Sequence, residues 1–343
     1  MEDELRYGVA ACQVDQPNPT DRAEMARNTA RMVEMVDMAV EGYGPFMDIK
    51  LLAFPEFGHA APIYPTAKSL LAKLAVPVPN EHTARLEDKA RELGVYIQTA
   101  TFLEEDPQWP GKVFNTTCLL GPEGLWYKYR KVNPWIPWEV HASPHDLADY
   151  ADELFPVAQT PIGSIGAAIC YDWLFPEPLR QLTANGAEIL VRVSAYMDPW
   201  GATPPMDWWT TVNRCRALEN TAYVLAANQG AELSHYPPFS WPGGSMVVDF
   251  DGRILAQADP GSGEKIVVSE VDIGALRHIR KRRAGHHTLA HLRSEAYPMY
   301  GQPYYPQGSF SAENNHTVAM NEERIAEVKQ RIMVVKKKRS EKK

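Results

Sequence analysis

The sequence predicts an α/β fold in which mixed β-sheets are covered by helices. Two observations favour this class: short apolar segments alternate with segments of helical spacing along most of the 343 residues, and turn compositions join some apolar segments directly. The direct turns predict antiparallel hairpins, which a purely parallel doubly wound sheet lacks. Hydrophobic residues make up 45% of the chain and charged residues 23%, which is enough apolar material for a full core.

The first half is predicted to repeat a strand-and-helix unit and then to form a hairpin. Met25, Met32, Val36 and Val40 recur at helical spacing, and Gly-Pro-Glu-Gly at 121–124 has the composition of a turn. The predicted helices are 22–40 and 81–93, and the predicted strands are 7–14, 50–54, 95–102, 113–120 and 125–129.

The second half continues the alternation and ends in a segment of different composition. The predicted helices are 177–185 and 206–220, and the predicted strands are 164–169, 188–193, 223–228, 245–250, 254–257 and 265–271. We therefore expect one domain over residues 1–290. Residues 291–343 are expected to form a C-terminal arm, rich in Tyr, Pro and Gly over 297–310, followed by a charged helix over 321–343 with a solvated basic end.

Charge and composition exclude several classes of partner. The net charge of −8 and the lack of a basic, aromatic-interleaved stretch in the main body argue against nucleic acid. No run of about 18 apolar residues is present, so no membrane span is predicted. The acidic start, Met1 to Glu4, differs from a secretory signal, and we expect a cytoplasmic protein.

The four cysteines are widely spaced and form no CxxC pair. Cys12, Cys118 and Cys215 lie in apolar or helical patterns and are expected to be packing residues. None of the ten histidines shows the spacing of metal ligands, so neither a metal nor another cofactor is predicted.

Three ionisable residues each follow directly on a predicted strand. Glu56 follows LLAFP, Lys131 follows LWYKYR, and Cys170 follows SIGAAI. Strand ends gather at one edge of a sheet, where ligand sites of α/β folds form. One such residue would be weak support, since a single cysteine is usually structural and a single lysine usually solvated, but three together predict a site.

The three residue types suit attack on an amide carbonyl. A thiol supplies little thiolate at neutral pH and needs a neighbouring base, which Glu56 can provide because confinement raises the pKa of a carboxyl group. Lys131 and the backbone N–H of Tyr171 can stabilise the tetrahedral oxyanion by roughly a few kcal/mol. The sequence therefore predicts that Cys170 is a nucleophile.

These segments resemble the nitrilase superfamily. FPEF at 54–57, YRKVNPWIPWE at 129–139 and CYDWLFPE at 170–177 are similar to its three signature segments, with support from RALEN at 216–220 and VVDFDGRIL at 247–255. The resemblance covers most of residues 5–290. It implies an α-β-β-α sandwich with the C-terminal arm attached, and a Glu-Lys-Cys triad made of Glu56, Lys131 and Cys170.

The segment around Lys131 is similar to the aliphatic amidase and formamidase branch, which has a second glutamate after the lysine. The resemblance assigns this role to Glu139, whose carboxylate would keep Lys131 protonated. Asp172 is expected to orient its loop through backbone hydrogen bonds. Trp173 stands where that branch usually has glycine. We expect it to line an aromatic substrate pocket together with Phe57, Trp135, Trp138, Tyr171, Tyr196 and Met197.

We therefore expect an amidase that hydrolyses a small-molecule amide through a thioester on Cys170 and releases ammonia or an amine. A nitrilase and an N-carbamoyl amide hydrolase remain as alternatives because the same residues serve all three reactions. A non-catalytic binding relative is the alternative from another class. The resemblance also implies a homo-oligomer built from dimers. We further expect the C-terminal arm to clasp a neighbouring subunit.

Overall fold

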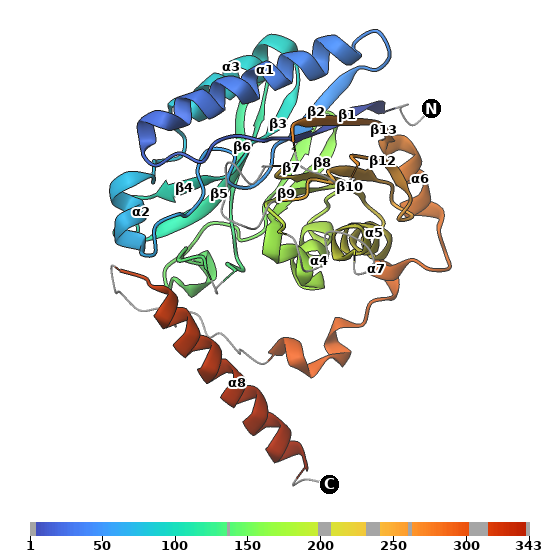
Figure 1. The fold of residues 1–343 in the computed structure, drawn as a ribbon. Coiled ribbons are helices and arrows are strands. Elements are labelled where there is room, and N and C mark those ends of the chain that lie inside the picture. The colour runs from blue at the N-terminus through green and yellow to red at the C-terminus, as the bar shows by residue number, and fades with distance from the viewer. Residues whose placement is uncertain are drawn as a thin grey trace.

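The structure, a computed structural model, describes residues 5–135, 138–197, 207–230, 241–259, 263–301 and 315–340. Two β-sheets lie face to face, and helices cover their outer faces (Figure 1). This arrangement is an α-β-β-α sandwich in a single domain, and it confirms the fold class that the sequence predicts.

The first sheet has seven strands in the order β13-β1-β2-β3-β5-β4, with β6 paired to β5. β1 pairs in parallel with β2 and antiparallel with β13, so the sheet is mixed. α1 and α3 cover its outer face (Figure 1). The elements are β1 (Arg6–Gln13), η1 (Arg22–Glu24), α1 (Met25–Tyr43), β2 (Ile49–Ala53), α2 (Ala67–Lys73), α3 (Glu81–Leu93), β3 (Tyr96–Gln98), β4 (Phe102–Glu105), β5 (Val113–Gly121), β6 (Gly124–Arg130) and β13 (Lys265–Asp272).

The second sheet has six strands in the order β12-β11-β10-β9-β8-β7, and α4 and α5 pack on its outer face. β8, β9 and β10 are parallel, and hairpins close both edges. The elements are η2 (Pro144–Asp146), β7 (Val157–Thr160), β8 (Gly163–Ile169), η3 (Cys170–Leu174), α4 (Pro176–Ala184), β9 (Ile189–Ser194), α5 (Trp208–Asn220), β10 (Tyr223–Asn228), β11 (Met246–Val248), β12 (Ile254–Gln257) and α6 (Ile273–Arg282).

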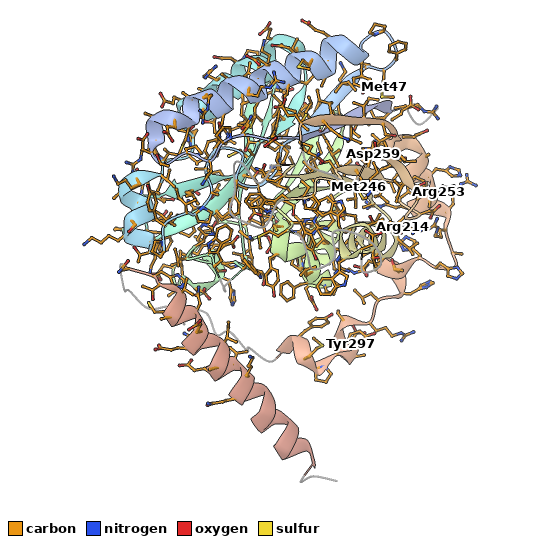
Figure 2. The ribbon with its side chains drawn as sticks, in the orientation of Figure 1. Met47, Arg214, Met246, Arg253, Asp259 and Tyr297 are labelled. Atoms are coloured by element: carbon orange, nitrogen blue, oxygen red, sulfur yellow. The ribbon has the colours of Figure 1, made fainter. Side chains whose placement is uncertain are left out.

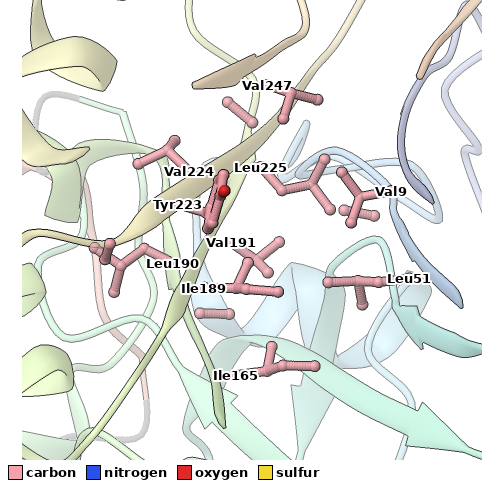
Figure 3. Close-up of a cluster of buried hydrophobic side chains, with 14 of the residues drawn as sticks. Val9, Leu51, Ile165, Ile189, Leu190, Val191, Tyr223, Val224, Leu225 and Val247 are labelled. Carbon is pink, nitrogen blue, oxygen red and sulfur yellow. The ribbon is translucent and has the colours of Figure 1, made fainter. Parts of the chain in front are cut away.

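Apolar side chains fill the space between the two sheets (Figure 2), where Met246 of β11 is fully buried. Figure 3 shows Val9 and Leu51 of the first sheet opposite Val191 and Leu225 of the second. All four are at most 1% exposed, and each such side chain contributes roughly 1.5–3 kcal/mol to folding. The core fixes the strand ends, and with them the residues that follow each strand.

The main difference from the sequence prediction is at 95–102, which is not one strand. The chain breaks between β3 and β4 because each pairs with a different part of β5. At the break, Thr99 accepts a hydrogen bond from the Cys118 N–H, and Thr101 accepts one from the Phe57 N–H at 2.9 Å. The break therefore supports the turn that carries Glu56. The sequence prediction also missed the short helix α2, the edge strand β7 and the helix α6.

The C-terminal segment contains α7 (Thr288–His291), η4 (Ser294–Ala296), η5 (Pro298–Gly301) and α8 (Val318–Ser340). α8 extends away from the sandwich, as Figure 1 shows. It confirms the predicted charged helix through residue 340. The expected extended arm at 297–310 lies mostly outside the described residues, and the domain boundary at 290 stays a prediction. None of the helices in the described part of the chain combines the length and apolarity that crossing a membrane requires.

Candidate active site

Glu56 lies fully buried just after β2, with hydrogen bonds to both carboxylate oxygens. Its Oε1 accepts from Lys131 Nζ at 2.7 Å and from Asn115 Nδ2 at 2.8 Å, and its Oε2 accepts from the Ala195 N–H at 3.0 Å. Gln229 Nε2 donates to the Glu56 backbone carbonyl at 2.7 Å. Three segments therefore hold this carboxylate in one orientation, and a fourth holds its backbone.

Lys131, directly after β6, is 1% exposed and lies between two carboxylates. Its Nζ donates to Glu56 and to both oxygens of Glu139, at 2.8 and 2.9 Å. Glu139 also accepts from the Trp135 N–H at 2.6 Å, and His141 lies 3.7 Å away. Burial disfavours the charged lysine, but Glu139 and Glu56 outweigh burial and raise its pKa. Lys131 is therefore a permanent ammonium.

The two carboxylates have opposite pKa shifts. Burial raises the pKa of Glu56, and the negative charge of Glu139 raises it further, against the lowering effect of Lys131. Burial also acts to raise the pKa of Glu139, but Lys131 and His141 outweigh it and lower that pKa to about 2. Such a separation of two neighbouring carboxyl groups suits them to different roles, Glu139 to that of a fixed counter-ion and Glu56 to that of a base.

Cys170 is the first residue of η3, at the sharp turn that directly follows β8, and its φ is positive at 43°. A non-glycine residue in that region is strained, and such strain gathers at functional sites. Asp172 holds the turn: its carboxylate accepts from the Ile169 N–H at 3.0 Å, the Tyr129 hydroxyl at 2.7 Å and the Asn133 N–H at 2.8 Å. The same carboxylate therefore ties the Cys170 turn to the loop that starts at Lys131.

Glu56, Glu139 and Cys170 all reach one cavity of about 380 Å³. Burial and then the Glu56 carboxylate raise the pKa of Cys170 to about 12, while Lys131 and the neighbouring Ser194 act in the opposite direction. The resting sulfur is therefore a neutral thiol. It needs a base at the moment of attack, and Glu56 is close enough to interact with it.

Six of the seven predicted pocket residues line this cavity: Phe57, Trp135, Trp138, Tyr171, Tyr196 and Met197. Trp173 does not, which corrects the sequence prediction. Its side chain is fully buried behind the turn, where its Nε1 donates to the Ala168 carbonyl at 3.0 Å and its ring faces the guanidinium of Arg192. The turn of η3 after Cys170 points Trp173 into the core.

The sequence prediction missed several site residues. Trp208 and Leu174 line the cavity, and Asn115 holds Glu56. Trp208 and Trp209 are adjacent in one predicted helix, so helical spacing could not show which of them faces the cavity. Trp209 is 1% exposed and packs in the core. Cys215 is exposed on α5, so its expected packing role was wrong. Within the described ranges, no three His, Cys, Asp or Glu side chains gather in a way that could hold a metal ion.

An α-β-β-α sandwich with a cysteine, a glutamate and a lysine at one edge defines a nitrilase-like class of fold and site. A model of the carbon-nitrogen hydrolase family matches residues 8–281. The chain belongs to the carbon-nitrogen hydrolase family, and it is therefore a hydrolase of carbon-nitrogen bonds.

Individual related proteins and solved structures support the assignment of the chain to this family. The formamidase of Bacillus cereus strain B4264 is 30% identical over 266 residues, which cover 77% of this chain and 73% of that protein. A formamidase of Bacillus anthracis has the same identity and coverage. Among solved structures, Saccharomyces cerevisiae Nit3, a member of branch 10 of the nitrilase superfamily, superposes with a TM-score of 0.68 at 25% identity over 83% of this chain and 98% of that chain. The amidase from Nesterenkonia sp. AN1 shares the fold, with a TM-score of 0.64 at 20% identity over 86% of this chain and 99% of that chain.

Proposed function

We propose that this protein is an amidase that hydrolyses a carbon-nitrogen amide bond through a cysteine thioester. The observation that carries the proposal is that Cys170 and Glu56 line one cavity and that Lys131 is hydrogen-bonded to Glu56 beneath it, although the three residues lie far apart in the chain. The similarity to formamidases at 30% identity supports an amide as the substrate.

In the first half-reaction, the Cys170 sulfur forms a bond to the amide carbonyl carbon as Glu56 accepts the thiol proton. Lys131 and the backbone N–H of Tyr171 stabilise the oxyanion of the tetrahedral intermediate. The carbon-nitrogen bond then breaks, and the Glu56 proton passes to the nitrogen, which leaves as ammonia or an amine. A neutral resting thiol fits this order, because the proton moves during the attack.

In the second half-reaction, water attacks the thioester carbon while Glu56 accepts a proton from the water. The carbon-sulfur bond breaks, the carboxylic acid is released, and the proton returns to Cys170. Glu139 does not exchange protons. Its low pKa keeps it charged, and its two hydrogen bonds hold the Lys131 ammonium in place.

The test is ammonia release from matched substrates by the wild-type protein and by Cys170→Ala. We expect release from a simple amide, little from the matching nitrile or N-carbamoyl amino acid, and a loss of about 10⁴-fold or more in kcat for the variant. Mass spectrometry should detect an acyl group on Cys170. Activity that survives in a folded Cys170→Ala protein contradicts the proposal, and preference for the nitrile or the carbamoyl compound selects one of the alternatives.

We also propose that the protein is a cytoplasmic homo-oligomer whose C-terminal segment contacts a neighbouring copy. Leu292, Tyr297, Met299 and Tyr300 in this segment are 43–57% exposed, and Figure 2 shows Tyr297 below the main body. Exposed apolar residues in one short segment favour a protein contact. Truncation after residue 295 should reduce the assembly size in gel filtration, and an unchanged elution volume contradicts the clasp.

A further inference from the structure

The cavity above Cys170 is larger than a formamide-sized substrate requires. Its volume of about 380 Å³ equals on the order of a dozen water molecules at about 30 Å³ each. Pockets that bury drug-sized ligands have volumes of roughly 300–1,000 Å³. A one-carbon or two-carbon acyl group would leave most of this space to water.

The walls away from the reacting groups are apolar and largely aromatic. Trp138 packs edge-to-face against Phe57 and against Trp135, with 6.3 Å between ring centroids in both pairs. On another part of the wall, Trp208 lines the cavity while 41% of its surface is exposed, which places it at the entrance. Clusters of edge-to-face rings accept a further ring with additional stabilisation.

The charge of the lining argues against an anionic acyl group. Glu56 and Glu139 are the charged residues among the described lining residues, and no lysine or arginine lines the cavity there. The Lys131 ammonium beneath it already donates to both carboxylates. At the described walls, a substrate carboxylate would therefore lose its hydration without gaining a lysine or arginine partner.

We propose that the acyl group of the substrate is uncharged and carries an aromatic ring or a branched aliphatic group. This inference rests on the amide hydrolysis proposed above and names its substrate class. It also excludes N-carbamoyl amino acids and monoamides of dicarboxylic acids, because both place a carboxylate in the apolar part of the cavity.

Two matched pairs of amides test size and charge separately. For size, kcat/KM for phenylacetamide should exceed that for acetamide by about 100-fold or more, because several ring carbons enter the apolar walls. For charge, 4-methylpentanamide should exceed the isosteric succinamate by a similar factor. Acetamide at parity with phenylacetamide, or succinamate at parity with 4-methylpentanamide, overturns the inference.

The outcomes separate this inference from the proposed function. If formamide or acetamide is hydrolysed and the larger neutral amides are not, the amidase stands and the substrate class is wrong. If none of the amides is hydrolysed, the proposed function fails and the inference falls with it.

A variant pair on one helix tests the aromatic wall. Trp208→Ala should reduce the phenylacetamide-to-acetamide ratio of kcat/KM by about 10-fold, since one face of the entrance is lost. Leu218→Ala is the matched control, because Leu218 lies on the same helix, is 53% exposed and does not line the cavity. An unchanged ratio in a folded Trp208→Ala protein contradicts the assigned contact.

Discussion

The side chain of Asn321 donates a hydrogen bond of 2.9 Å to the backbone carbonyl of Glu139, 182 residues earlier in the chain. Asn321 is fully buried in the first turn of α8, and His316 Nε2 lies 2.6 Å from its Oδ1. Asn321 lies outside residues 8–281, the part that matches the family, whereas Glu139 lies inside it. The C-terminal segment therefore holds the backbone of the residue that pairs with Lys131.

Asn321→Asp should impair the site more than the fold. The aspartate keeps an acceptor for His316 but loses the donor to Glu139, and an unmatched buried carbonyl costs about 1–3 kcal/mol. We expect kcat/KM to fall about 10-fold, with a shift in the acid limb of its pH profile. Glu322→Gln, an exposed change one residue later, is the control. An unchanged pH profile and unchanged kcat/KM in Asn321→Asp would show that the contact does not position Glu139.

Glu139→Gln should move the acid limb of the kcat/KM profile to lower pH. Glu56 must be deprotonated to act as a base, and the charge of Glu139 raises its pKa. Removal of that charge lowers the pKa of Glu56, so the base is available at lower pH. Maximal activity should still fall, because Lys131 loses one partner. Exposed Glu177→Gln, the same charge change, should leave the profile in place. An acid limb of the kcat/KM profile that stays in place or moves to higher pH would contradict the electrostatic effect of Glu139 on Glu56.

Alkylation by iodoacetamide should distinguish the four cysteines. Cys215 is exposed and should react in every variant, whereas burial raises the pKa of Cys12 and Cys118 and keeps both inert. Cys170 should react at pH 8 in the wild-type protein, and about 10-fold or more slowly in Glu56→Gln, because losing the proton acceptor outweighs the lower thiol pKa that follows from removing the Glu56 charge. Peptide mass spectrometry measures all four rates, with Cys215 as internal control. Equal rates for Cys170 and Cys12 would refute an activated thiol.

Trp173→Phe should affect stability and leave substrate preference unchanged. The smaller ring removes the hydrogen bond to the Ala168 carbonyl and leaves a gap beside Arg192. Urea unfolding should show a loss of about 1–3 kcal/mol in the free energy of unfolding. The phenylacetamide-to-acetamide ratio of kcat/KM should stay constant, whereas it should change in Trp138→Phe. A changed ratio in Trp173→Phe would place Trp173 in contact with the substrate after all.

Asp146→Asn should stabilise the protein at pH 8 and not at pH 4. Burial raises the pKa of Asp146 to about 6, against the lowering effect of His145 and Arg324. Since the folded state binds this proton more tightly than the unfolded chain, stability falls as pH rises from about 4 to about 6. The amide removes that penalty, which is about 3 kcal/mol above pH 6. Thermal unfolding at both pH values measures it, and equal effects at both values contradict the assigned shift.

The sequence by itself determined the order of the main strands and helices and the residues that follow each strand. The spacing of apolar residues predicts which positions are buried, and the burial pattern of the strands and helices in the sandwich follows that spacing closely. Glu56, Lys131 and Cys170 could be predicted as a set because strand ends meet at one edge of a sheet. Local sequence patterns are sufficient where the bounds of a helix depend only on its own residues. The helix 81–93 is an example, because it begins and ends where the sequence predicts.

Only the tertiary structure decided which aromatic residues face the substrate cavity and what holds the charged residues. Trp173 turns into the core and Trp208 lines the cavity because the rotation of η3 and α5 depends on what each packs against. The opposite pKa shifts of Glu56 and Glu139 depend on distances to Lys131 across three separate segments. The bond from Asn321 to Glu139 joins residues 182 positions apart, a separation that no local pattern encodes.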